Sequence, residues 1–182
     1  MRVLVLGVGN VFMGDDGCGV AVAQSLEGQV EGGDVRDLGT GGLPAVDFMS
    51  NYDLVVIVDA AEVDDVKVIE VGDKAGEDEI AETVLSMAVG GSHGLGVMDL
   101  INLVRVGGDV PKIVIVGCRP ERLEVGIGLS REMVGRCVKA IEVISELLSK
   151  YNVQVNVDGA KSRLLHNELA RTHDVNERSG TR

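Results

Sequence analysis

The sequence predicts a single α/β domain of three layers, in which a mostly parallel, twisted sheet is covered by helices on both faces. The chain has 182 residues, a length that suits one domain of about 100–200 residues. Several short runs are apolar and β-branched without alternation, which is typical of parallel strands buried on both sides. Stretches with the apolar spacing of a helix separate these runs, as an α/β sheet requires.

Five segments carry the features of strands. Three are continuous apolar runs that end at a polar residue or a glycine, and we expect them at the centre of the sheet. A fourth is weaker, and a fifth alternates as an edge strand does. The central strands are Val3–Leu6, Leu54–Val58 and Ile113–Val116, the weaker one is Asp34–Leu38, and the edge strand is Lys67–Val71.

Three stretches place apolar residues along one face of a helix. Gly17–Leu26 follows the first strand, and Gly94–Val106 precedes the third central strand. The longest is Arg131–Lys150, and Ser130 before it is a candidate N-cap because its hydroxyl can accept a hydrogen bond from a free backbone N–H.

The character of the chain changes near Asn152. Residues 153–157 alternate apolar and polar side chains, so they are expected to form one late edge strand. From residue 159 the chain is polar and of mixed charge. We therefore expect a domain over residues 1–158, followed by a polar tail over residues 159–182 that is poorly ordered or forms a loosely docked helix.

Charge and aromatic content exclude several classes of partner. With 29 acidic and 17 basic residues the formal net charge is −12, and such a surface repels nucleic acid and anionic membranes. Two Tyr, two Phe and no Trp leave few side chains on which bases stack. No apolar stretch approaches the roughly 20 residues that cross a bilayer. Neither a nucleic-acid partner nor membrane insertion is expected.

The cysteine pattern favours a reducing compartment. Cys18, Cys118 and Cys137 are odd in number and form no Cys-x-x-Cys pair, so their spacing indicates neither a disulfide framework nor a thiolate zinc site. Acidic residues interrupt the apolar run after Met1, and no cleavage site of a signal peptide follows. A cytoplasmic location is expected.

The first segment that could carry chemistry is the glycine-rich run Gly7–Gly17, directly after the first strand. A dinucleotide fingerprint would need a glycine where Phe12 stands, so no nucleotide cofactor is expected. Asp15 and Asp16 lie beside a helix start, where the helix dipole favours ionised carboxylates that can bind a cation. An Asp that caps the helix within a glycine-rich turn explains the same pattern without a site.

Two further residues are placed to join these carboxylates. Asp59 follows the strand Leu54–Val58, and the carboxyl ends of parallel strands meet at one edge of a sheet. His93 has glycines close by, which leave its imidazole uncrowded. Two carboxylates and an imidazole suit Zn²⁺, Ni²⁺ or Mn²⁺ better than Mg²⁺ alone. Taken singly, a loop Asp and a structural His explain each residue as well.

A glycine turn follows the weaker strand candidate. An ordinary turn after a strand explains it, and so does a loop whose exposed N–H groups hold an extended peptide. The loop begins at Asp37, and its residues that would contact a peptide are Gly39, Thr40, Gly41 and Gly42.

These segments, in this order, resemble the hydrogenase maturation endopeptidases, the family that removes the C-terminal extension of nickel–iron hydrogenase large subunits. The resemblance runs from residue 1 to about residue 150, and five blocks in family order make it specific. The blocks are Leu4–Asn10 with Asp15–Gly19, Asp37–Gly42, Val56–Ala60, Ser92–Gly96, and Gly117 with Pro120-Glu121, Leu123-Glu124 and Gly126–Ser130.

The resemblance implies a protease with the fold described above and a metal site formed by Asp16, Asp59 and His93. The first of these positions is Glu in some relatives. The nickel is implied to arrive in the precursor, so that the protease detects nickel loading before it cuts. The metal, or a carboxylate such as Asp16, would activate the attacking water. The backbone of the loop Gly39–Gly42 would position the extension, and Asp37 would orient that loop.

Two alternatives of other classes stay open. A non-enzymatic nickel-binding assembly chaperone would use the same three ligands but would release no peptide. A nucleotide-dependent oxidoreductase would need to bind its cofactor at Gly7–Gly14. The motifs together favour the endopeptidase, with the hydrogenase large-subunit precursor as its partner.

Overall fold

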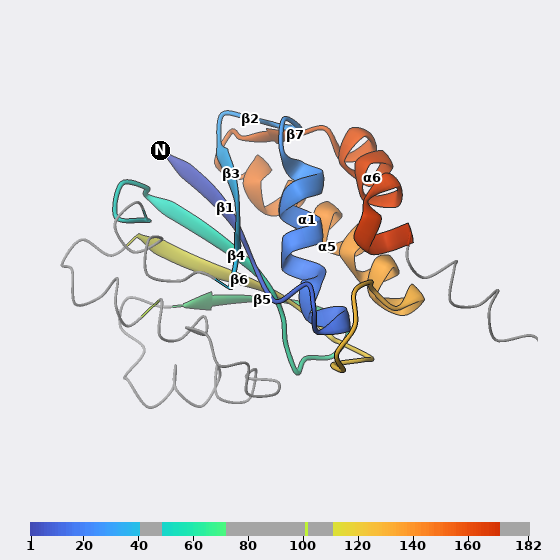
Figure 1. Cartoon of the computed structure of the whole chain (residues 1–182). Coiled ribbons are helices and arrows are strands. Elements are labelled where there is room, and N and C mark those ends of the chain that lie inside the picture. The colour runs from blue at the N-terminus through green and yellow to red at the C-terminus, as the bar shows by residue number, and fades with distance from the viewer. Residues whose placement is uncertain (41–48, 72–100, 102–110, 172–182) are drawn as a thin grey trace, which may run out of the picture.

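The computed structural model describes residues 1–40, 49–71, 101 and 111–171. Within these residues five strands form one sheet in the order β3-β1-β4-β6-β5 (Figure 1). Neighbouring strands are parallel except β5, which is antiparallel to β6. This arrangement confirms the predicted α/β class with a mostly parallel sheet. The strands are β1 (Val3–Val8), β3 (Asp34–Gly39), β4 (Leu54–Ala60), β5 (Val66–Val71) and β6 (Lys112–Cys118).

The helices α1, α5 and α6 lie together on one face of this sheet (Figure 1). A short 3-10 turn, η1, leads directly into α1 at the edge where the strand β1 ends. None of the helices in the described part of the chain has both the length and the apolar character needed to cross a membrane. Their bounds are η1 (Gly14–Gly17), α1 (Cys18–Leu26), α5 (Arg131–Ser149) and α6 (Val157–His166).

The end of the chain differs from the sequence-based expectation. The predicted edge strand after Asn152 shrinks to β7 (Gln154–Val155), which pairs with β2 (Val30–Glu31) in a separate antiparallel ribbon. The helix α6 covers the start of the segment that was expected to be a poorly ordered tail or a loosely docked helix, and its Ala160 and Leu164 are fully buried. Of these two alternatives, the structure shows the docked helix, and it packs into the core. Residues 172–182 lie outside the described residues.

The central strands are buried because the sheet is packed on both faces. Successive side chains of a strand point to opposite faces, so Val3 and Val5 join the core beneath α1, α5 and α6. Leu4 and Leu6 join a second core on the other face. That core includes Ile101, the one described residue of the predicted helix 94–106. Burial on both faces explains why the strand sequences show no polar alternation.

Two local features fix the helices relative to the sheet. Ser130 is the N-cap of α5, as predicted, because its Oγ accepts a hydrogen bond of 3.2 Å from the N–H of Met133. Gly19 lets the first turn of α1 press against the ends of β1 and β4, since a Cβ there would overlap the carbonyl oxygens of Val8 and Val58. The start of α1 therefore lies at the carboxyl edge of the sheet.

Candidate functional site

The carboxyl edge of the sheet brings Asp16 and Asp59 close together. Asp16 lies in η1, just after β1, and Asp59 is the penultimate residue of β4. The two strands are parallel neighbours, with Gly7 paired to Val58, so they end at the same edge. The turn η1 also contacts β4. We call Asp16 and Asp59 the carboxylate pair.

The electrostatics of the carboxylate pair show that its members influence each other. Burial raises the pKa of Asp16, and a hydrogen bond of 2.9 Å from the N–H of Asn10 partly opposes this rise. Burial raises the pKa of Asp59 well above its ordinary value, and the charge of Asp16 raises it further. The N–H of Ala60, 2.8 Å from Asp59 Oδ1, acts in the opposite direction. Like charges held together disfavour ionisation, and a cation between them would relieve that repulsion.

Asp15 turns away from the carboxylate pair and is fully buried. Its Oδ2 accepts hydrogen bonds from the N–H groups of Glu121 and Arg122, both at 2.9 Å, and from the Ser130 hydroxyl at 2.7 Å. Its Oδ1 accepts a hydrogen bond of 2.6 Å from the N–H of Ser130. Four donors leave no room for a cation, so the expectation that both Asp15 and Asp16 can bind one fails for Asp15.

The glycine-rich run shapes the turn that carries Asp16. Gly9 has a φ of 147°, a conformation that L side chains rarely adopt. A Cβ at this position would overlap the carbonyl oxygen of Asp16. The N–H of Gly9 also donates to the carbonyl of Gly39 at 3.0 Å, which ties the end of β1 to the end of β3. The run thus brings η1 back over the sheet edge.

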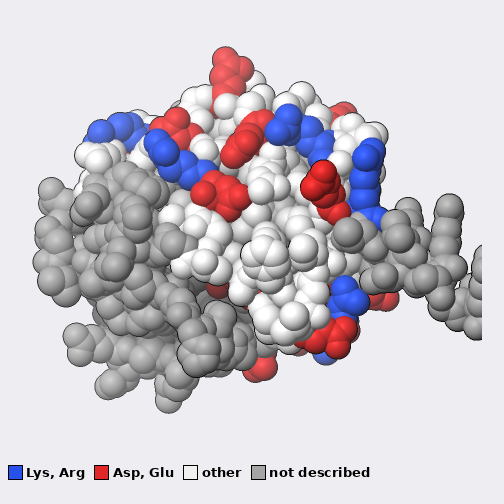
Figure 2. Space-filling view, in the orientation of Figure 1, with Lys and Arg blue, Asp and Glu red and all other residues white. Residues whose placement is uncertain are grey.

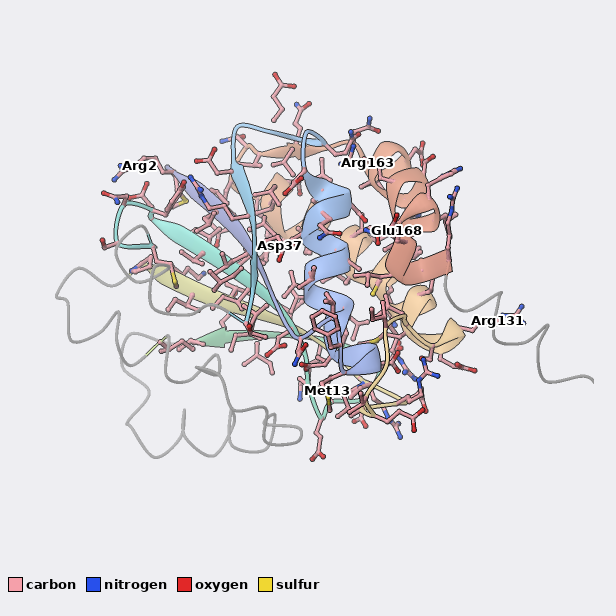
Figure 3. The ribbon with its side chains drawn as sticks, viewed as in Figure 1. Arg2, Met13, Asp37, Arg131, Arg163 and Glu168 are labelled. Carbon is pink, nitrogen blue, oxygen red and sulfur yellow. The ribbon has the colours of Figure 1, made fainter. Side chains whose placement is uncertain are left out.

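Asp37 lies on the edge strand β3 and faces α1. Its carboxylate accepts hydrogen bonds of 2.9 Å from Gln24 Nε2 and from the N–H of Gly39. Figure 3 labels Asp37 beside α1, whereas Met13, in the turn before Asp16, lies at the lower end of that helix. Asp37 therefore holds the start of the predicted glycine loop and is not a member of the carboxylate pair. Thr40 is exposed, and residues 41 and 42 lie outside the described residues.

A complete metal site is not visible in the described part of the chain. Among the residues that the structure describes, no three His, Cys, Asp or Glu side chains are grouped to hold an ion. His93, the predicted third ligand, lies outside these residues. The carboxylate pair can therefore supply two oxygen-donor side chains to a divalent cation, or accept a proton from water.

Sequence reasoning missed a cluster of thiols near the carboxylate pair. Cys18, Cys118 and Cys137 are free and buried. The sulfur atoms of Cys18 and Cys137 lie 2.8 Å apart, and the thiols of Cys18 and Cys118 also interact. Burial raises the pKa of Cys137, which keeps its thiol protonated and unreactive. No local signal reveals this cluster, because Cys18 and Cys137 are 119 positions apart.

The chain is thus an α/β protein with acidic side chains at the carboxyl edge of a mostly parallel sheet. The HycI family, described as hydrogenase maturation protease, matches residues 20–147, which is more than half of the chain. The chain therefore belongs to the hydrogenase maturation protease family.

Individual relatives agree with this assignment. The chain is 29% identical over 163 residues to the hydrogenase 2 maturation protease of Escherichia coli, covering 85% of this chain and 94% of that protein. The structure of the hydrogenase maturating endopeptidase HybD from E. coli is similar with a TM-score of 0.70, at 29% identity, over 85% of this chain and 96% of that one. The maturation protease HybD of Thermococcus kodakarensis matches with a TM-score of 0.66 and 26% identity, over 81% and 99%.

Proposed function

We propose that this protein is an endopeptidase that removes the C-terminal extension of a nickel-loaded hydrogenase large-subunit precursor. Membership of the maturation protease family supports the reaction class. The observation that carries the proposal is the carboxylate pair, because two acidic side chains with raised pKa values at one sheet edge are typical of a reactive site. A cytoplasmic location is proposed as well, and the free cysteines support it.

The nickel in this proposal is part of the substrate. Asp16, Asp59 and His93 would bind it where the precursor presents it, and the donor set suits that ion because imidazole and carboxylate are common ligands of nickel. Binding a divalent cation would also relieve the repulsion that raises the pKa of Asp59. A precursor without nickel would leave this repulsion in place, and so it would bind less well.

Asp16 would act as the general base. Its Oδ2 accepts the N–H of Asn10, and no described residue donates a hydrogen bond to its Oδ1, which leaves that oxygen free to accept a proton. Water would attack the scissile carbonyl carbon, and its proton would pass to Asp16 and then to the leaving amine.

The loop Gly39–Gly42 would hold the extension through its backbone groups. The carboxylate of Asp37 accepts a hydrogen bond from the N–H of Gly39, and the carbonyl of Gly39 accepts one from the N–H of Gly9. These two bonds anchor the start of the loop beside the turn that carries Asp16. Asp37 is therefore proposed as a positioning residue for the loop.

The test uses nickel-loaded and nickel-free large-subunit precursors of the source organism. Each is incubated with the protein, and the mass of the large subunit is measured. We expect shortening of the nickel-loaded precursor only, and none with Asp59→Asn. Equal shortening of both precursors would contradict nickel recognition. Stable binding without any shortening would contradict the protease and support the assembly chaperone.

A further inference from the structure

Three large apolar side chains are exposed at the same sheet edge as the carboxylate pair. The exposed fractions are 62% for Phe12, 86% for Val125 and 53% for Ile127. Phe12 lies in the turn that carries Asp16, and Val125 and Ile127 flank Gly126 in the loop before α5. Figure 2 shows an uncharged surface in the lower middle of the molecule, where Figure 3 labels Met13. We call these three side chains the apolar surface.

Backbone contacts hold the two segments of the apolar surface side by side. The N–H of Gly126 donates to the carbonyl of Phe12 at 2.9 Å, and the N–H of Gly14 donates to the carbonyl of Gly126 at 2.9 Å. Met13 pairs with Gly126 as an isolated β-bridge. Phe12 is thereby brought next to Val125 and Ile127, although the two segments are far apart in the sequence.

The apolar surface is fixed in place before any partner arrives. Asp15 accepts four hydrogen bonds from the loop that carries Val125, and its own N–H donates to the carbonyl of Arg122 at 2.9 Å. A surface that is already ordered loses little conformational entropy when a partner binds. The exposed ion pair of Arg122 and Glu124, at 3.6 Å, lies in the same loop and gives the surface a polar margin, as protein interfaces have.

The apolar surface is connected directly to the carboxylate pair. The N–H of Phe12 donates to Asn10 Oδ1 at 3.0 Å, and the N–H of Asn10 donates to Asp16 Oδ2 at 2.9 Å. An extended chain advances about 3.3 Å per residue, so the residues next to a peptide bond held at Asp16 are close enough to reach this surface. Clustered apolar side chains on the outside of a protein mark interaction sites.

We propose that the apolar surface of Phe12, Val125 and Ile127 binds an apolar segment of the hydrogenase large-subunit precursor next to the scissile bond. This inference rests on the proposed function, because the precursor is the partner that the carboxylate pair would act on. The inference adds residues that recognise side chains of the substrate. The proposed metal ligands and the backbone of the glycine loop do not supply such recognition.

The test measures the binding of purified nickel-loaded precursor by calorimetry and its shortening by mass spectrometry. The variants are Phe12→Ser and the double variant Val125→Ser with Ile127→Ser. Leu165→Ser is the matched control, because Leu165 is 57% exposed on α6 and does not belong to the apolar surface. Thermal melts establish that each variant is folded.

We expect both surface variants to bind the precursor about tenfold more weakly, as removal of a buried apolar anchor does. KM should rise to the same extent while kcat stays within about twofold, since these residues make no contact with the reacting atoms. Leu165→Ser should match the unaltered protein in both measurements.

The outcomes separate this inference from the proposed function. Affinity that is unchanged in both surface variants overturns the docking proposal, even if the precursor is shortened. Weakened binding in the variants, with no shortening by the unaltered protein, supports the docking surface and contradicts the protease. Absence of binding by the unaltered protein overturns the docking proposal. The docking proposal is also overturned if the unaltered protein is a dimer and Phe12→Ser makes it a monomer without any loss of affinity for the precursor. In that case the apolar surface binds a second copy of the chain.

Discussion

Asp15 and Asp16 are neighbours in the sequence, yet their side chains belong to two different regions of the molecule. Asp15 is fully buried beneath the loop before α5, and its carboxylate accepts four hydrogen bonds. Among the described residues, Asp16 accepts a hydrogen bond only from Asn10, and it lies near Asp59 at the sheet edge. Hydrogen bonds stabilise the turn around Asp15, whereas burial disfavours the charged form of Asp16 and raises its pKa.

A single turn therefore carries both a structural and a reactive carboxylate. A buried carboxyl group whose oxygens already accept four hydrogen bonds has nothing left to offer a substrate. A carboxylate that is destabilised by burial and by a nearby like charge becomes more stable when it binds a cation or a proton. Asp15 holds the turn in place, and the position of Asp16 depends on that turn. The following predictions test this division, beginning with the largest effect.

Asp15→Ala should be the most damaging substitution in this turn. It leaves donors of Glu121, Arg122 and Ser130 without a partner, and each unsatisfied buried group costs about 1–3 kcal/mol. We expect the free energy of unfolding in urea to fall by about 4 kcal/mol. Asp15→Asn should lose less, because its amide oxygen still accepts hydrogen bonds. A loss below about 1 kcal/mol in Asp15→Ala would remove the supporting role.

Asp16→Asn should have the opposite profile. The amide oxygen can still accept the N–H of Asn10, so the free energy of unfolding should change by less than about 1 kcal/mol. Shortening of the precursor should slow at least about 100-fold, because an amide cannot take a proton from water. The rate is measured in single turnover. A variant that cuts normally, or one as unstable as Asp15→Ala, would show that Asp15 and Asp16 do not have separate roles.

Ser130→Ala tests the support of Asp15 with a smaller expected effect. The hydroxyl of Ser130 donates to Asp15 and accepts the N–H of Met133 at the start of α5. Losing an N-cap costs about 0.5–2 kcal/mol, and we expect a fall of that size in the free energy of unfolding. Ser130→Thr keeps the hydroxyl and serves as the control. Equal losses in both variants would show that packing, and not the hydroxyl, matters here.

The smallest effect is a dependence of stability on pH that comes from Asp59. The pKa of Asp59 is raised in the folded state, from an unfolded value of about 3.9. At a pH between these two pKa values, the folded protein binds more protons than the unfolded protein. This contribution to stability is present below the unfolded pKa and is lost as pH rises through the folded pKa. Asp59→Asn should therefore be more stable than the unaltered protein at neutral pH. Thermal melts across this pH window test it, and identical curves for the two proteins would refute it.

Much of the fold follows from local sequence patterns. Continuous apolar runs predicted the strands β1, β4 and β6, which the structure extends by at most two residues at either end. The helix α5 and its cap at Ser130 were also predictable, because an amphipathic stripe and a capping hydroxyl are local features. The docking of α6 was only one of two alternatives at the sequence level, since this helix buries only Ala160 and Leu164 in a polar segment.

The site was only partly predictable. The meeting of Asp16 with Asp59 follows from the rule that parallel strands end at one edge. The different environments of Asp15 and Asp16 do not follow from that rule, because they depend on hydrogen-bond donors more than 100 positions away in the sequence. The thiol cluster and the exposed apolar side chains likewise arise from long-range contacts. His93, Gly41 and Gly42 lie outside the described residues, so their roles stay predictions.

Asp16 and Asp59 form one electrostatic unit, in which the charge of Asp16 raises the pKa of Asp59. A pH titration of the Asp59 carboxyl carbon by NMR, in the unaltered protein and in Asp16→Asn, tests it without any partner protein. Removal of the charge at Asp16 should move the titration midpoint of Asp59 to lower pH, while burial keeps that midpoint above the ordinary value for aspartate. A midpoint that is the same in both proteins would contradict the claim.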